Sequence, residues 1–189
     1  MNAFAYCAAS FERSVLRAAG VVPLLSPPCV ADTFDPALLA GRDLIYFKLH
    51  GLPGEIYWYG DGWLTALRLD QIQAADLTGA VVFVANCFGL TDAGEPDVMV
   101  QALLDAGARA VVAGAGENWG ALRGVTGPDL LGQWMRRGMR LRFTPVLALR
   151  VARMRVRVRL RRRNLSWDER KALEDALEFR LLLPEWREL

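Results

Sequence analysis

Ala-Val-Val-Phe-Val-Ala, residues 80–85, is the stretch that decides the fold. A continuous apolar run that is rich in β-branched and aromatic residues is typical of a strand buried on both of its faces. A second run of this kind, Ala-Val-Val-Ala, occupies residues 110–113. Such strands occur mainly in parallel sheets that helices cover on each side, so the two runs predict an α/β protein.

The residues before this run alternate between strand and helix patterns. Short apolar runs at residues 3–8, 21–25 and 44–49 predict strands, and helical spacing predicts helices at 11–19 and 36–40 between them. This alternation is expected of a mostly parallel, doubly wound sheet.

A different pattern interrupts the winding between residues 53 and 69. Two aromatic segments, residues 56–59 and 63–67, flank turn residues at 60–62, which predicts a hairpin outside the main sheet. The winding then resumes, and the sequence predicts further helices at residues 70–75, 97–106 and 128–137.

The arginine-rich stretch that follows fits two kinds of secondary structure. Charged and apolar residues alternate strictly from 153 to 161, as they would in a strand. Leu149, Ala152, Val156 and Leu160 would also line one face of a helix. The pattern alone leaves both alternatives open.

The length of 189 residues suits one domain with an extension. We expect an α/β domain over residues 1–145 and a basic, then amphipathic, helical extension over residues 146–189. A capping box, Ser166 with Glu169 three residues later, marks a helix start in this extension. With 53% hydrophobic and 23% charged residues, the composition is that of a globular protein.

Membrane, disulfide and metal-binding classes are not expected. No apolar run approaches the roughly 18 residues of a membrane span, and the N-terminus lacks the positive region of a secretory signal, so we expect a cytoplasmic protein. Cys7, Cys29 and Cys87 are odd in number and lack the spacing of metal ligands. We therefore expect at least one free thiol, no metal and no organic cofactor.

The net charge of +2 conceals a segregation of charge along the chain. Residues 1–129 carry a net charge of −7, residues 130–163 carry 12 arginines and no acidic residue, and residues 164–189 carry −3. The run from Arg136 to Arg163 would repel itself if left bare, so it needs an anionic counterpart. Three candidates are the acidic part of the same chain, a partner protein and nucleic acid. We rank the same chain first, because the sequence contains no nucleic-acid-binding module.

Two residues whose side chains could act in catalysis lie at the ends of predicted neighbouring strands. His50, the single histidine, ends the strand at 44–49, and Cys87 follows the strand at 80–85. Ligands of open α/β sheets bind at the carboxyl ends of the strands, so both residues lie where a site is expected. An imidazole beside a thiol favours the nucleophilic thiolate, and the amides of Gly51 and Cys87 could form an oxyanion hole.

The order of these segments resembles a known family. Asp-Leu-Ile-Tyr-Phe-Lys-Leu-His-Gly at 43–51, the hairpin, the strand ending at Cys87, and Leu-Leu-Asp-Ala-Gly-Ala-Arg-Ala-Val-Val at 103–112 resemble the CHAT branch of the caspase-like cysteine peptidases of clan CD. This group also contains the caspases, separase and gingipain. The resemblance implies a three-layer caspase-like sandwich, with His50 as the base, Cys87 as the nucleophile and the backbone of Gly51 in the oxyanion hole.

The chain also departs from the family pattern. Ala85-Asn86-Cys87 stands where the family more often has Ser-Ala-Cys, and residues 114–119 lack the usual tryptophan-containing pattern. That loop would line the specificity pocket, so substrate preference is the property put in doubt. Our candidates for the substrate pocket are Asp92, Glu117, Asn118 and Trp119.

The sequence therefore predicts a cytoplasmic cysteine endopeptidase that acts on a protein or peptide through a thioester. An acidic pocket would favour basic residues before the cleaved bond, and a partner protein would control the enzyme. The alternative is a catalytically inert caspase-fold scaffold, and nucleic-acid binding through residues 136–163 ranks below both.

Overall fold

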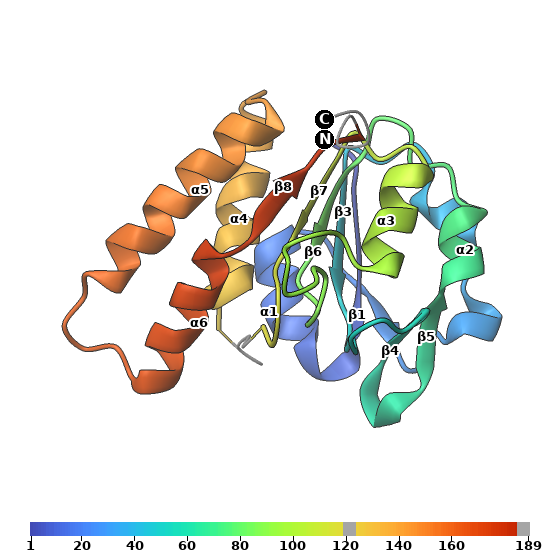
Figure 1. The fold of residues 1–189 in the computed structure, drawn as a ribbon, viewed down its shortest axis with the longest axis horizontal. Coiled ribbons are helices and arrows are strands. Elements are labelled where there is room, and N and C mark those ends of the chain that lie inside the picture. The colour runs from blue at the N-terminus through green and yellow to red at the C-terminus, as the bar shows by residue number, and fades with distance from the viewer. Residues whose placement is uncertain (119–123, 185–189) are drawn as a thin grey trace.

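A computed structural model describes residues 1–118 and 124–184. Within them, six strands form one sheet in the order β2-β1-β3-β6-β7-β8, and β4 and β5 form a separate antiparallel hairpin (Figure 1). All neighbours in the sheet are parallel except β7 and β8. The strands are β1 (Ala3–Ala8), β2 (Leu24–Ser26), β3 (Leu44–Lys48), β4 (Tyr57–Tyr59), β5 (Thr65–Arg68), β6 (Val81–Val84), β7 (Ala110–Ala113) and β8 (Arg180–Leu182).

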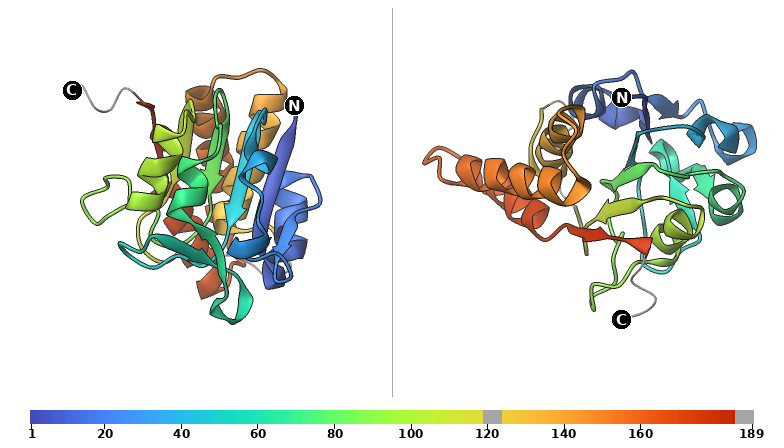
Figure 2. Two further views of the ribbon diagram at one scale, coloured as in Figure 1. Left: turned by 90° about the vertical axis from the view of Figure 1, so that its right-hand side faces the viewer. Right: turned by 90° about the horizontal axis from the view of Figure 1, so that it is seen from above.

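Helices cover both faces of the sheet, so the protein has three layers (Figure 2). One face carries α2 and α3, and the other carries α1, α4, α5 and α6. The helices are α1 (Glu12–Ala19), α2 (Leu69–Gln73), α3 (Val98–Asp105), α4 (Gly127–Arg140), α5 (Pro145–Leu160) and α6 (Trp167–Leu177). The predicted α/β class, with a mostly parallel sheet between helices, is confirmed.

Alternate residues of each central strand enter different hydrophobic cores. In β3, Ile45 and Phe47 pack toward α2 and α3, whereas Leu44 and Tyr46 pack toward α1 and α4. The side chains of β6 divide in the same way. Burial of each large apolar side chain contributes about 1.5–3 kcal/mol, which explains why these strands are largely apolar.

A buried ion pair connects β3 to α4. Lys48 Nζ lies 2.5 Å from Asp129 Oδ2, and both side chains are buried. Lys48 also donates to Ser14 Oγ in α1 at 2.9 Å, and the hydroxyl of Tyr46 donates to Asp129 Oδ1 at 2.8 Å. The polar groups therefore satisfy each other inside the helical layer.

The structure settles the ambiguous segment in favour of a helix. Residues 145–160 form α5, whose Ala148, Leu149, Ala152 and Val156 are buried in the core. The capping box at Ser166 is present as predicted. The helix expected at 128–137 continues to Arg140, and the strand expected at 21–25 begins only at Leu24.

One strand was not predicted. β8 lies in the C-terminal region expected to be helical and pairs antiparallel with β7, so that residues 146–184 add a strand to the sheet as well as two helices. The division of the chain at residue 145 stays a prediction. No helix in the described ranges is long and apolar enough to cross a membrane.

Candidate active site

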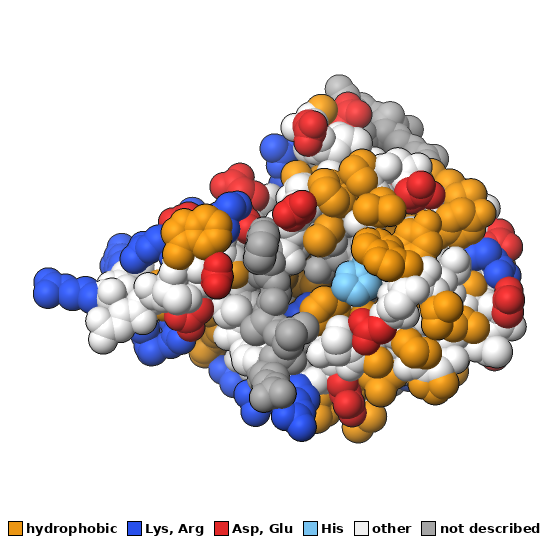
Figure 3. All heavy atoms as spheres, turned by 90° about the horizontal axis from the view of Figure 1, so that it is seen from below, with side chains coloured by type: hydrophobic (Ala, Val, Ile, Leu, Met, Phe, Trp, Pro, Cys, Tyr) orange, Lys and Arg blue, Asp and Glu red, His pale blue; other side chains and the backbone are white. Residues whose placement is uncertain are grey.

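The carboxyl ends of β3 and β6 bring His50 and Cys87 to the same cleft. These strands pair in register from Leu44 with Val81 to Phe47 with Val84, so the residues that follow them emerge side by side. The cleft has a volume of about 460 Å³. Figure 3 shows the single histidine at the rim of this hollow, with hydrophobic side chains around it. The lining residues are Phe11, His50, Gly51, Leu52, Trp63, Cys87, Phe88, Glu117 and Asn118.

The hairpin fixes the position of His50. The amide of His50 donates to the carbonyl of Tyr59 at 2.8 Å, and the amide of Tyr59 donates back at 2.9 Å. The imidazole packs between two aromatic rings, with centroid distances of 5.4 Å to Phe11 and 5.5 Å to Trp63. The hairpin that leaves the main sheet therefore forms one wall of the cleft.

Asp61, in the turn of the hairpin, is an acidic neighbour of His50. Its Oδ1 lies 3.7 Å from His50 Nε2, and both side chains are 34% exposed. The amide and hydroxyl of Ser10 donate to the same carboxylate at 2.7 and 2.8 Å. Asp61 is thus held in place beside the imidazole and can stabilise its positive charge.

The thiol of Cys87 is half-buried and touches the loop after β7. The backbone amide of Asn118 donates to Cys87 Sγ at 3.4 Å. Burial raises the pKa of the Cys87 thiol, and the negative charge of Glu117 raises it further, while this hydrogen bond acts in the opposite direction. The net pKa is raised, so the thiol holds its proton near neutral pH.

Close backbone packing joins the two candidate catalytic residues. A Cβ at position 51 would lie 2.4 Å from the carbonyl oxygen of Cys87, so only glycine fits there. The buried side chain of Asn86 accepts a hydrogen bond from the amide of Leu49 at 2.7 Å. The side-chain amide of Asn118 donates to the carbonyl of Asn86. Asn86 therefore links β3, β6 and the loop after β7.

Two cleft residues have an uncommon backbone conformation. Trp63 and Phe88 adopt φ values of 59° and 54°, in the left-handed region that bulky residues rarely occupy. Residues in strained conformations often cluster at functional sites. Phe88 directly follows Cys87, so the strain lies beside the thiol.

The structure brings together most, but not all, of the predicted site residues. His50, Gly51, Cys87, Glu117 and Asn118 line one cleft. Asp92 lies in the exposed turn between β6 and α3, and the described lining of the cleft does not include it. Trp119 lies outside the described residues.

The other two cysteines lie away from the cleft lining, and no thiol is in a disulfide. Burial raises the pKa of Cys7 to about 12, so this thiol is inert near neutral pH. Cys29 is half-buried near Tyr6, whose hydroxyl donates to its carbonyl. Within the described ranges, no group of three or more His, Cys, Asp or Glu side chains could hold a metal ion.

Comparison with known proteins shows which solved structure has a similar fold. No protein-family profile and no curated protein matches the sequence. Among solved structures, the Arg-specific cysteine proteinase gingipain R is similar, with a TM-score of 0.57 and 13% sequence identity over 95% of this chain. The matched region is 45% of the gingipain chain, so this protein spans less than half of that enzyme. At this identity the similarity shows the fold alone, and the fold is caspase-like.

Proposed function

We propose that this protein is a cysteine endopeptidase of the CHAT type, with Cys87 as the nucleophile and His50 as the general base. One observation carries the proposal: the only histidine and a half-buried cysteine emerge from neighbouring parallel strands into one cleft. The similarity of the fold to a cysteine proteinase supports it.

In the proposed mechanism His50 first takes the proton of the Cys87 thiol. This transfer is needed because the pKa of the thiol is raised in the resting cleft. The thiolate attacks the carbonyl carbon of the scissile bond, and the amides of Gly51 and Cys87 stabilise the oxyanion. The imidazolium, paired with Asp61, returns its proton to the leaving amine as the carbon–nitrogen bond breaks.

Water then hydrolyses the thioester. His50 accepts a proton from the water, the resulting hydroxide attacks the acyl carbon, the carbon–sulfur bond breaks to release the carboxylic acid product, and the imidazolium returns its proton to the sulfur of Cys87. This cycle needs no metal and no organic cofactor. We place the enzyme in the cytoplasm, with its peptidase unit at residues 1–145 and its C-terminal extension at 146–189.

The charge of the cleft favours a basic substrate side chain. Glu117 lines the cleft, and Asp61 lies beside His50, whereas no lysine or arginine is among the described lining residues. A guanidinium or ammonium group of a substrate would gain an ion pair there. We therefore expect cleavage after arginine or lysine, a preference that the specificity of gingipain R for arginine supports.

A fluorogenic peptide library that samples every residue before the cleaved bond tests the proposal. Wild type should cleave, with basic residues preferred, and His50→Ala and Cys87→Ala should each lose at least roughly a hundredfold in rate. Cys29→Ala, which changes a half-buried thiol outside the cleft lining, is the matched control and should retain activity. Equal turnover by wild type and Cys87→Ala would refute the assignment.

The second candidate is an inert scaffold with the same fold. The raised pKa of Cys87 favours it, because a thiol held in its protonated form is a poor nucleophile. Alkylation separates the two functions. A working dyad should react with iodoacetamide at Cys87 well before Cys7 and Cys29, and this selectivity should disappear in His50→Ala.

A further inference from the structure

We propose that the groove between α5 and β8 binds an acidic peptide segment of a partner protein in an extended conformation. This inference goes beyond the peptidase proposal, because none of the groove residues lines the catalytic cleft. The groove has a volume of about 320 Å³. Its lining residues are Val146, Leu149, Arg150, Arg153, Arg157 and Leu181.

Among the residues that the structure describes, most arginines of the basic segment have no acidic side chain within ion-pairing distance. In the described ranges, Arg159 is the one arginine of residues 130–163 in an ion pair, with Glu169 at 3.8 Å. The expectation that the acidic part of this chain neutralises the segment is therefore not met among these residues. A row of uncompensated arginines on one helix is a surface suited to an anionic partner.

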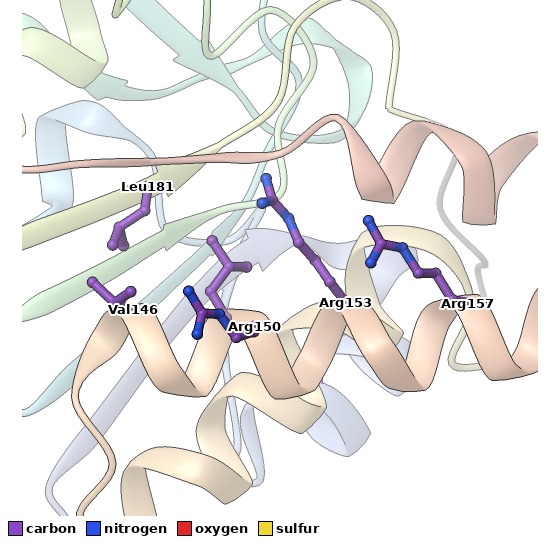
Figure 4. A pocket seen from close by; sticks show the side chains of 6 residues that line it. Val146, Arg150, Arg153, Arg157 and Leu181 are labelled. Atoms are coloured by element: carbon purple, nitrogen blue, oxygen red, sulfur yellow. The ribbon is translucent and has the colours of Figure 1, made fainter.

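The three arginines of the groove lie on one face of α5. Arg150, Arg153 and Arg157 follow helical spacing, and Figure 4 shows the side chains of Arg153 and Arg157 extending from α5 toward the segment that contains α6 and β8. Arg150 and Arg157 are exposed, so both can meet an incoming carboxylate in a bidentate pair.

Arg153 has a polar group that its present neighbours do not satisfy. One of its terminal nitrogens donates to the carbonyl of Phe179, but its buried Nε has no acceptor in the described part of the chain. Burial and the nearby charge of Arg157 lower the pKa of its guanidinium, while the negative charge of Glu178 acts in the opposite direction. A carboxylate bound in the groove would supply the missing acceptor and add a second counter-charge.

The floor of the groove favours a peptide over a nucleic acid. Val146, which is 50% exposed, lies near Leu149 and Leu181, and Figure 4 shows Leu181 directed from β8 toward Val146. Apolar side chains of a peptide would bury this surface, whereas a phosphate backbone would leave it in contact with water. Among the described residues, the groove lining also contains no aromatic ring on which a base could stack.

The edge of the sheet offers a second means of holding a peptide. β8 is the last strand in the described sheet order, and β7 is its hydrogen-bonded neighbour there. The other edge of β8 can therefore present backbone donors and acceptors to an extended segment. Such a segment places alternate side chains on one side, which suits carboxylates over the arginines and apolar groups over Leu181.

Fluorescence anisotropy tests the proposal with a labelled peptide in which glutamate alternates with valine or leucine. Roughly ten residues are enough to run past the arginine row at about 3.3 Å per residue. Wild type should bind this peptide, and the double variant Arg150→Gln with Arg157→Gln should bind at least roughly tenfold more weakly. A peptide with serine in place of the apolar residues should also bind more weakly.

The matched control is the double variant Arg155→Gln with Arg162→Gln. These two exposed arginines have the same spacing but line a different groove, beside Trp134 on α4, so their loss should change peptide binding less than about twofold. Circular dichroism checks that both double variants fold. Equal weakening in the two variants, tighter binding of oligo-dT than of the peptide, or no binding of the peptide by wild type would each overturn the proposal.

Discussion

Glu117 and Cys87 are coupled by charge within the cleft. Because the carboxylate of Glu117 raises the pKa of the Cys87 thiol, Glu117→Gln should lower that pKa. The rate of alkylation by iodoacetamide follows the thiolate fraction, so it should rise with pH from about 7 to about 9 and be about twofold higher in Glu117→Gln at each pH. Asp92→Asn, a change in an exposed turn, should leave the wild-type rate unchanged. A slower reaction in Glu117→Gln would contradict this account.

The carboxylate of Asp61 should support catalysis through the imidazole. Asp61→Asn removes the negative charge 3.7 Å from His50 Nε2 and thereby destabilises the imidazolium that forms during proton transfer. We expect kcat/KM for the best library peptide to fall about tenfold.

Ser10→Ala is the control for this prediction. It removes one hydrogen bond to Asp61 and keeps the charge, so it should lower kcat/KM less than Asp61→Asn does. If Ser10→Ala lowered kcat/KM as much as Asp61→Asn, the carboxylate would act through its hydrogen bonds and not through its charge.

The sequence was sufficient to place His50 and Cys87 but not to identify their neighbours. Each residue lies within three residues of the end of a largely apolar strand, and the ends of parallel strands meet at one edge of a sheet. Nothing in the sequence pattern around Asp61, a turn residue of the hairpin, indicates a contact with His50. Its contact with His50 depends on how the hairpin folds back and on two hydrogen bonds from Ser10, which is 51 residues away in sequence.

At the scale of elements, the local sequence pattern was enough to predict the secondary structure of some segments but not of others. Alternation made residues 153–161 resemble a strand, but the apolar face of α5 packs on α4, and this long-range packing selects the helix. β8 has only three residues, and its pairing with β7 joins segments about seventy residues apart. A strand this short carries no periodicity from which it could have been recognised.

The stability of the fold should depend on the buried ion pair between Lys48 in β3 and Asp129 in α4. Lys48→Met should lower the free energy of unfolding by about 3–5 kcal/mol, because it leaves the buried carboxylate of Asp129 without its counter-charge. Urea denaturation followed by circular dichroism measures the loss. The double variant Lys48→Met with Asp129→Leu should recover most of it, since no uncompensated charge remains. Strictly additive losses would show that the two side chains are not coupled.

Across the whole molecule, charge is separated more sharply than the net value suggests. The part that forms most of the sheet and the candidate site, residues 1–129, carries −7, and the segment that forms most of α4 and all of α5 carries 12 arginines without an acidic residue. Blue side chains accordingly gather at one end of the molecule in Figure 3. The proposed substrate cleft is therefore negatively charged and would select basic segments. The proposed peptide groove is positively charged and would select acidic segments.

This separation predicts how salt affects stability. A helix places residues about 1.5 Å apart along its axis, against roughly 3.3 Å in an extended chain, so folding of α5 brings its arginines closer together. Salt at about 0.1 M shortens the screening length from roughly 30 to about 10 Å and should weaken this repulsion. We expect the free energy of unfolding, measured in urea, to rise by on the order of 1 kcal/mol between low salt and about 0.3 M NaCl. Arg155→Gln with Arg162→Gln should flatten this rise, whereas stability that falls with salt would mean that attractive ion pairs dominate the surface.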